Sequence, residues 1–237
     1  MKQAIILFNL LVSSLLSYSQ SIVIEYNHII SFPTNSTEAV YRLETKGDKS
    51  VYYQLKSDFT EKEGNEVIQA NEGVIPFVIK DFSTKKTIYN QPIINSVKFI
   101  TDELPMQVWT LRNETKKIKS FTCKKATTTF RGRNYTAWYT EELSIIGGPW
   151  KFDGLPGLIL SVSSEDKVLN IEATKIEKKS NLELTKFDIQ EDKQINWEVY
   201  CIKYRKVIER IRKNMKADSD PDMEYDININ LVEDIGL

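Results

Sequence analysis

Paired carboxylates are the first residues in this chain that could do chemistry, as a general acid and a general base. Glu141-Glu142 and Glu165-Asp166 are examples of such pairs, and the two residues of each are adjacent in sequence. Neighbouring side chains of a strand point to opposite faces, so we expect solvated turn ends rather than an acid–base pair. The sequence contains no phosphate-binding loop, dinucleotide glycine motif, Gly-x-Ser-x-Gly elbow or His-Glu-x-x-His motif.

The single histidine and two cysteines limit the remaining chemistry. His28 would have to serve in any histidine-based metal site or catalytic dyad, and we expect it at a polar position of the first strand. Lys124 and Lys125 beside Cys123 would favour a thiolate, but no resolving cysteine is near. We therefore expect Cys123 to be a packed structural residue, unpaired with Cys201. The sequence points to no catalytic residue, metal or cofactor.

The segment 147–160 combines glycines, prolines and aromatic residues and then becomes apolar. Its residues Leu155-Pro156-Gly157-Leu158 are typical of a type II turn, in which Gly157 takes a positive φ. The aromatic residues either fill the core around a tight corner at Gly154, Pro156 and Gly157, or form one wall of a ligand pocket or partner-docking surface. They are Trp138, Tyr139, Trp150 and Phe152. Trp138 and Tyr139 face opposite sides of their strand, so at most one lines a given face.

Short alternating segments joined by polar turns surround these residues. Hairpins are predicted for 39–55 around 46–49, for 108–122 around Asn113-Glu114, for 127–139 around 131–134, and for 158–173 around 163–166. So many successive hairpins predict a mainly β (α+β) fold, with a large curved antiparallel meander sheet that is half-barrel or barrel-like.

Helical periodicity replaces this pattern between about 192 and 216. The expected apolar stripe faces the sheet and consists of Ile195, Val199, Ile202, Val207, Ile211 and Met215. A C-terminal amphipathic helix packed on the sheet is therefore predicted. The remainder, 218–237, is an acidic tail that we expect to be loosely attached.

The first 19 residues have the character of a signal peptide. Lys2 precedes an apolar run at 4–16 and a small-residue cleavage site, Ser17-Tyr18-Ser19. That run is too short to span a membrane, and no second one follows. Residues 20–217 would form a single domain that is periplasmic or secreted, without stable membrane insertion. The formal net charge of −1 gives no reason to expect nucleic acid as a partner.

Several motifs occur together in one order, which begins at Cys123 and continues through Arg131-Gly132-Arg133 and the strand 137–140. It ends with Gly148-Pro149-Trp150, Phe152 and Gly154-Leu155-Pro156-Gly157-Leu158-Ile159-Leu160. In this order, over about 109–162, the chain resembles the GLPGLI family of secreted bacterial proteins, Bacteroidota type. The family has no established activity. One departure is Ser144, where the family pattern usually has proline.

The resulting function hypothesis is an exported, non-enzymatic envelope protein that binds a hydrophobic small molecule or a partner polypeptide. A first alternative is an accessory subunit of an outer-membrane uptake or secretion system that docks by strand addition. A second is an enzyme using carboxylates or Cys123.

Overall fold

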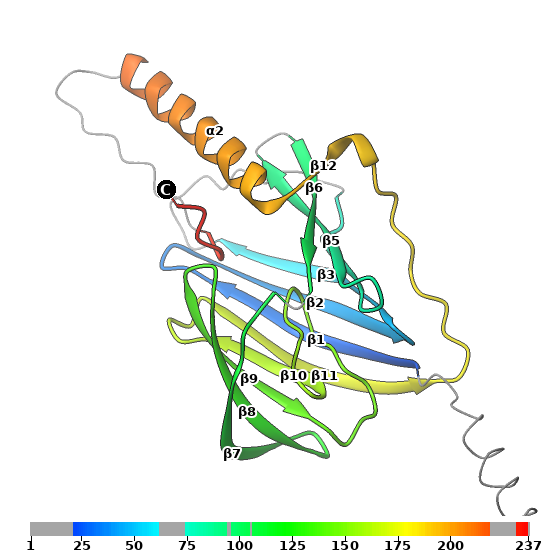
Figure 1. Ribbon diagram of the computed structural model, residues 1–237. Helices are drawn as coiled ribbons and strands as arrows, with labels where there is room; N and C mark the ends of the chain where they lie inside the picture. The colour runs from blue at the N-terminus through cyan, green and yellow to red at the C-terminus, as the bar shows by residue number, and fades with distance from the viewer. Residues whose placement is uncertain (1–20, 62–73, 94–95, 105, 219–230, 237) are drawn as a thin grey trace, which may run out of the picture.

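A computed structural model describes residues 21–61, 74–93, 96–104, 106–218 and 231–236. Its strands form one sheet (Figure 1). They are β1 (Ser21–Ser31), β2 (Asn35–Lys46), β3 (Lys49–Glu61), β4 (Phe77–Asp81), β5 (Lys86–Ile93), β6 (Ser96–Glu103), β7 (Thr110–Ile118), β8 (Phe121–Phe130), β9 (Arg133–Thr140), β10 (Leu158–Ser164), β11 (Leu169–Lys179) and β12 (Gln194–Ile195). A 3-10 turn, η1 (Glu191–Lys193), precedes β12, and the helix α2 (Trp197–Asp218) follows it.

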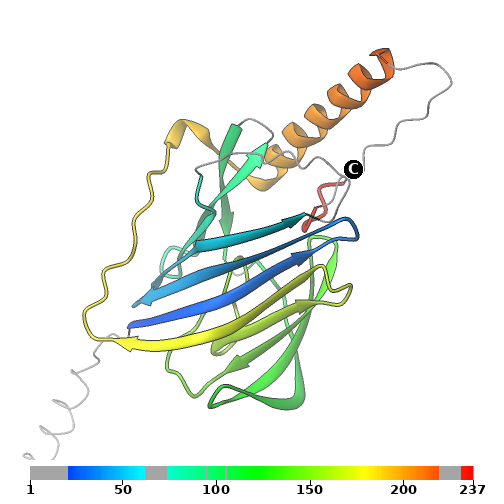
Figure 2. The same cartoon turned by 180° about the vertical axis from the view of Figure 1, so that it is seen from behind.

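The sheet has the order β12-β6-β5-β4-β3-β2-β1-β11-β10-β9-β8-β7. Neighbours are antiparallel except for β12 and β6, which are parallel. Two meanders, β1–β6 and β7–β11, are joined where β1 pairs with β11 along the whole length of β1. The sheet curls strongly without closing, because β7 and β12 stand at its two ends (Figures 1 and 2). The predicted curved, mainly β fold with a C-terminal helix is confirmed.

The hairpins at 39–55, 127–139 and 158–173 are also confirmed, but the turn predicted at Asn113-Glu114 is wrong. Both residues lie inside β7, and the chain reverses instead at Lys119, whose φ is 52°. The ladder between β7 and β8 shifts register between Leu111 and Thr115, so Asn113 and Glu114 mark an irregularity within a strand. Polar residues look like a turn here because β7 is an exposed edge strand.

The predicted helix exists, but its predicted buried face is right only in part: Ile195, which lies in β12, and Val207 are partly buried against the core. Val199, Ile202 and Met215 are exposed. The buried stripe instead runs along residues at spacings of three, four and seven, namely Trp197, Tyr200, Cys201, Tyr204 and Ile208. Aromatic side chains bury more area than Val or Ile, so the aromatic stripe determined which face of the first turns of α2 packs next to β6. The rest of the helix projects away from the sheet (Figure 1). The helix begins after Asn196, whose Oδ1 accepts a hydrogen bond from Val199 N as an N-cap.

The core lies on the inner face of the sheet. Large side chains there include six buried tyrosines, among them Tyr26, whose hydroxyl donates to the Ile159 carbonyl oxygen at 2.7 Å. Leu104 and two connecting segments, 106–109 and 141–157, supply further buried side chains to this core, notably Leu143 and Phe152. The second of these segments builds the candidate site.

The predicted signal peptide at 1–19 and residues 219–230 of the predicted tail lie outside the described residues. Residues 231–236 are described, and they do not form a loose end. Glu233 and Ile235 are both buried. No helix among the described residues combines the length and apolar character needed to cross a membrane.

Candidate functional site

A buried lysine from β4 holds the loop between β9 and β10. Lys80 Nζ donates hydrogen bonds to the carbonyl oxygens of Phe152 at 2.6 Å and Gly148 at 3.3 Å. The Asp153 carboxylate lies 3.3 Å from the same nitrogen, and both side chains are 1% exposed. Burial lowers the pKa of Lys80, while Asp153 opposes that shift. One buried cation therefore fixes both ends of the segment that carries Trp150 and Lys151.

The segment 106–109 holds the same loop from the other side. Gln107 Nε2 donates to the Lys151 carbonyl oxygen at 3.0 Å, and Trp109 Nε1 donates to the Asp153 carbonyl oxygen at 2.6 Å. Trp150 has a φ of 50°, in the left-handed region, which is unfavourable for residues other than glycine. These contacts hold the loop in that conformation. Strain of this kind persists only where the surroundings over-determine the conformation.

The predicted type II turn at Leu155-Pro156-Gly157-Leu158 is wrong. Positive φ occurs at Gly154, where it is 83°, and Gly157 is not among the glycines with positive φ. Gly157 N instead donates to the Leu155 carbonyl oxygen at 2.8 Å, which closes a tighter turn centred on Pro156. Glycine is needed at 157 because a Cβ there would lie 2.2 Å from the Thr140 carbonyl oxygen. At this corner the backbone of Gly157 therefore lies directly against the backbone of Thr140.

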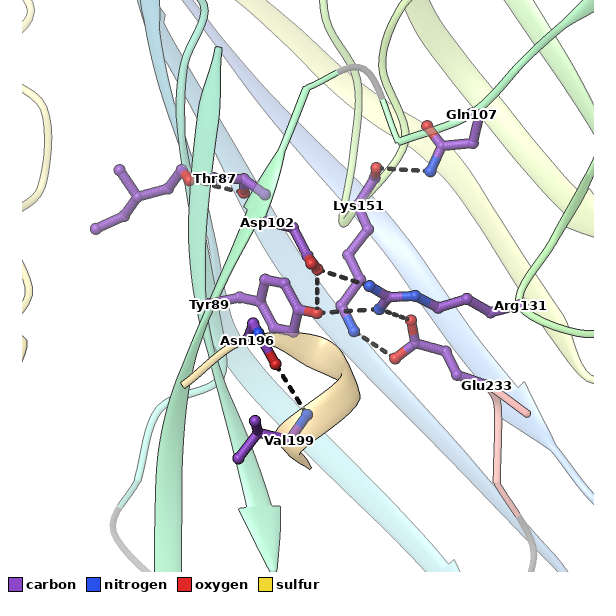
Figure 3. A network of polar contacts seen from close by, with 10 residues as sticks. Thr87, Tyr89, Asp102, Gln107, Arg131, Lys151, Asn196, Val199 and Glu233 are labelled. Carbon is purple, nitrogen blue, oxygen red and sulfur yellow. Dashed lines mark hydrogen bonds and ion pairs between the residues drawn. The ribbon is translucent and has the colours of Figure 1, made fainter. Parts of the chain in front are cut away.

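Five polar residues, each from a different strand, turn or segment, meet beside this loop (Figure 3). Arg131 donates to Glu233 at 2.5 Å and to Asp102 at 2.6 Å. Lys151 Nζ also pairs with Glu233. The Tyr89 hydroxyl donates to Asp102 at 2.7 Å and accepts from Arg131 at 3.0 Å. Each carboxylate thus has a cationic partner, as buried charges require.

Aromatic rings shield this charged cluster from water. The guanidinium carbon of Arg131 lies 3.6 Å from the centre of the Trp197 ring, and Lys151 Nζ lies 4.0 Å from the centre of the Tyr89 ring. Burial lowers the pKa of Lys151 to about 8, although Glu233 acts in the opposite direction. Burial also raises the pKa of Tyr89, and Glu233 adds to that shift. The cluster is therefore a low-dielectric site in which cations lie against ring faces.

A small pocket adjoins the cluster on the inner face. Its volume is about 180 Å³, and Tyr89 and Lys151 belong both to its lining and to the cluster. Other aromatic side chains of the lining are Tyr41, Tyr52, Phe77 and Trp150. Tyr41 and Tyr52 stack with their ring centres 4.9 Å apart. Gln91 and Asn90 contribute polar groups, so the pocket is a mainly aromatic cavity with a few polar contacts.

His28 lies behind the aromatic wall of the pocket. Its ring centre is 4.7 Å from that of Tyr41, and its Nδ1 lies 3.1 Å from the Tyr52 hydroxyl oxygen. Burial lowers the pKa of His28 to about 3. The expectation of a polar position on the first strand is therefore wrong: His28 is a neutral, buried support for the two stacked tyrosines.

The four aromatic residues that the sequence singled out do not form one wall. Tyr139 and Phe152 are core residues, and Phe152 is fully buried among Trp109, Phe130 and Tyr135. Trp138 lies on the other face of β9 from Tyr139, as predicted, with Lys116 Nζ 4.6 Å from its ring centre. Trp150 alone of the four lines the pocket. Leu155 is also buried, so the core interpretation holds for most of this group.

Cys123 and Cys201 are both free and buried, as predicted. Burial raises the pKa of Cys123 to about 11, so the adjacent lysines do not produce a thiolate. The acidic pairs are also accounted for by surface contacts. Glu141 pairs with Lys124 at 2.7 Å, and Asp166 pairs with Arg133 at 2.8 Å.

A larger and more open groove of about 490 Å³ lies elsewhere, over β7–β10. Its lining consists mainly of hydroxyl-bearing side chains such as Thr127, Thr136 and Ser163, and it contains none of the aromatic residues predicted as a site. We favour the smaller pocket because aromatic rings and a buried cation converge there, whereas the groove is polar and shallow.

Sequence reasoning missed the charged members of the site. From the sequence, Arg131 is only part of a predicted turn, and Lys80 is not among the candidate residues. No sequence pattern marks Asp102 and Glu233 as members of one site, because they lie 131 positions apart. Only the fold brings both carboxylates to Arg131. An available clue was Lys80 itself, a lysine that directly follows the apolar residues 77–79.

Comparison with known proteins identifies the chain as a β-rich domain of a glycanase-related protein. The family model described as "N-glycanase peptide, N-terminal domain" matches residues 65–205, more than half of the chain. The chain therefore belongs to this family. Arg131, Lys151 and Asp153 lie within the matched range, whereas His28 and Glu233 lie outside it.

Solved structures agree with this assignment at the level of the fold. PNGF-II in a C2 crystal form is 18% identical with a TM-score of 0.52, over 82% of this chain and 34% of that one. PNGF-II in a P21 form is 20% identical with a TM-score of 0.51, over 79% and 34%. The chain spans about a third of the length of these structures. No curated protein matches it.

Proposed function

We propose that the chain is a non-enzymatic binding domain of an exported glycanase-related protein, and that its pocket beside Trp150 binds a hydrophobic group of a partner polypeptide. The observation that carries the proposal is the aromatic lining of the pocket, formed by Tyr41, Tyr52, Tyr89 and Trp150. A volume of about 180 Å³ is below the roughly 300–1,000 Å³ typical of small-molecule sites. The pocket therefore fits one side chain or ring better than a whole lipid.

The charged cluster supports binding rather than catalysis. Arg131, Lys151, Asp102 and Glu233 are paired with one another, and Arg131 and Glu233 are largely buried. A general acid or base needs a free position toward its substrate. Here the paired groups instead stiffen the wall of the pocket, because Lys151 and Tyr89 are held from behind.

A second candidate ligand is a single sugar ring. Gln91 and Lys151 lie beside the aromatic faces of Tyr89 and Trp150, and a few polar groups among rings can orient a hydroxylated ligand. The matching family is named for an N-glycanase, which favours a ligand derived from a glycopeptide.

Docking by strand addition has weaker support. β7 is an edge strand of the sheet, which is the geometry that strand addition needs. However, its exposed residues include Arg112, Glu114 and Lys116, and charged side chains are a common protection against edge pairing.

Calorimetric titration with three probes tests the proposal. The probes are a synthetic peptide with one phenylalanine beside an Asn-x-Thr site, the same peptide carrying an N-linked chitobiose, and free chitobiose. We expect both peptides to bind, and Trp150→Leu to weaken binding about tenfold or more, because it removes one aromatic wall. The matched control is Trp138→Leu, which changes the same residue type on the opposite face of the sheet.

Equal binding of both peptides to the wild type and Trp150→Leu would refute the pocket as the site. Binding of chitobiose and the glycopeptide alone would select the sugar-ring candidate. Absence of binding for all three probes would leave no support for a binding domain of either kind.

Export and GLPGLI membership belong to the same proposal. They rest on Lys2, the apolar run at 4–16 and the cleavage site before Gln20, and on the motifs at 109–162. The mass of the exported protein tests the first point: we expect a chain starting at Gln20, and retention of Met1 would contradict export by cleavage.

A further inference from the structure

The segment 231–236 lies against the β8–β9 turn and near the start of α2, far in sequence from the strands that it contacts (Figures 1 and 2). Asp234 N donates to the Arg131 carbonyl oxygen at 2.9 Å. Arg133 donates to the carbonyl oxygens of Leu231, at 2.8 Å, and Val232. The segment bends at Val232 and Glu233, and the turn binds its backbone through these hydrogen bonds.

Side chains give this contact its specificity. Glu233 is 5% exposed and is held by both Arg131 and Lys151. Ile235 is buried beside it, and its carbonyl oxygen accepts from Arg205 of α2 at 3.0 Å. The receiving surface thus selects an acidic residue followed, two positions later, by an aliphatic one.

A glycine at the tip of the turn makes room for the segment. Gly132 has a φ of 82°, and a Cβ there would lie 2.5 Å from Asp234 Cβ. A side chain at this position would clash with Asp234, and the positive φ would also strain the turn. Gly132 therefore offers a way to block the site separately from its charges.

The receiving surface is cationic without the segment. Arg131 keeps Asp102 as a partner, but Glu233 is the carboxylate paired with Lys151 among the described contacts. A buried cation that loses its partner is strongly unfavourable, so the surface is complementary to an acidic peptide. None of these contacts depends on the pocket having a ligand, although Lys151 borders both.

We infer that the Arg131–Arg133 turn, Lys151 and Arg205 form a binding site for a short acidic peptide, which the chain's own segment 231–236 occupies here. The segment competes with a partner polypeptide that carries the same pattern, a glutamate-aspartate pair between aliphatic residues. A partner polypeptide of this kind binds the site in trans, and it can bind only after the chain's own segment 231–236 has left the site.

The test uses the full chain with Glu233→Lys, which places a third cation against Arg131 and Lys151 and so releases the segment. A fluorescent hexapeptide with the sequence of residues 231–236 is then titrated by anisotropy. We expect saturable binding to this variant and at least about tenfold weaker binding to the wild type, whose own segment competes at high effective concentration. A peptide with glutamine in place of the glutamate should bind about tenfold more weakly, because it lacks the charged acceptor.

Adding Gly132→Leu to Glu233→Lys should abolish binding, whereas the matched change Gly47→Leu, in the β2–β3 turn, should not. Failure of the folded Glu233→Lys protein to bind millimolar peptide, or binding that survives Gly132→Leu, would overturn the inference. Hydrogen exchange of the wild type gives an independent result even if Glu233→Lys does not fold. We expect the Asp234 amide to exchange at least about tenfold faster than amides of β1, and exchange only through global unfolding would overturn the inference.

Discussion

Lys80 and Asp153 form a buried ion pair, with 3.3 Å between Nζ and Oδ2 and 1% exposure of each side chain. The pair joins β4 to the loop that carries Trp150. Asp153 Oδ2 has no hydrogen-bond partner, so Lys80 balances its charge by proximity while donating its hydrogen bonds to backbone carbonyls. The position of the pocket wall therefore depends on a pair of charges in the core.

Removing one member of this pair should cost more than removing both. Lys80→Met leaves a buried, uncompensated carboxylate and should lower the free energy of unfolding by about 3–5 kcal/mol. Lys80→Met with Asp153→Leu removes both charges and should be destabilised by less, since only the loop hydrogen bonds are lost. Urea unfolding of the two variants checks this. A double variant less stable than Lys80→Met would show that the pair is stabilising in itself.

Gly157→Ala should be more harmful than Gly154→Ala, although Gly154 is the residue with positive φ. The new Cβ at 157 would lie 2.2 Å from the Thr140 carbonyl oxygen, so β9 and the corner must separate, at a cost of about 2 kcal/mol or more. At 154 the cost is that of left-handed backbone, about 1 kcal/mol. Thermal unfolding of both variants measures the difference, and the reverse order would contradict the close-approach explanation.

His28 should remain neutral well below the usual titration range of histidine. Its folded pKa is about 3, against 6.5 for the unfolded chain, so the unfolded state binds the proton first as the pH falls. Stability from this group is complete above pH 6.5 and is lost toward pH 3, at about 1.4 kcal/mol per pH unit. Because the chain has one histidine, proton NMR follows it without ambiguity. Imidazole signals that shift between pH 7 and 5 would disprove the buried, neutral state.

A matched variant isolates this effect from other acid-sensitive groups. His28→Asn has no titrating side chain, so its loss of stability between pH 6.5 and 5 should be smaller than that of the wild type by about 2 kcal/mol. Equal losses in the two proteins would assign the acid sensitivity elsewhere.

The two thiols should be countable but slow to react. Unfolded, unreduced protein should show both Cys123 and Cys201 as free thiols, because neither is paired. In the folded protein Cys123 should react at least about tenfold more slowly than a model thiol, since burial raises its pKa to about 11. Timed reaction with a thiol reagent, with and without denaturant, gives both values. Rapid labelling of folded protein at Cys123 would contradict its packed position.

Local patterns predicted those parts of the fold that local physics controls. Alternation along 39–55 and 158–173 placed the hairpins correctly, because side-chain period and turn residues are properties of neighbouring positions. The opposite facing of Trp138 and Tyr139 followed from the same rule. Helical spacing located α2, but the helix has two overlapping stripes of apolar or aromatic side chains, either of which could have been buried. Packing against β6 and the charged cluster buried the stripe through Tyr200 and Cys201.

The sequence by itself determined a curved, mainly antiparallel sheet with a C-terminal helix, two unpaired cysteines and a glycine requirement at 157. Only the tertiary structure decided why that glycine is needed, where His28 lies and how the site is built. The reason is distance along the chain: Asp102, Arg131 and Glu233 meet through long-range contacts, and the strength of each ion pair depends on the burial that those contacts create. The sequence gives the type of each side chain, but the whole fold determines which side chains are buried and which charges are paired.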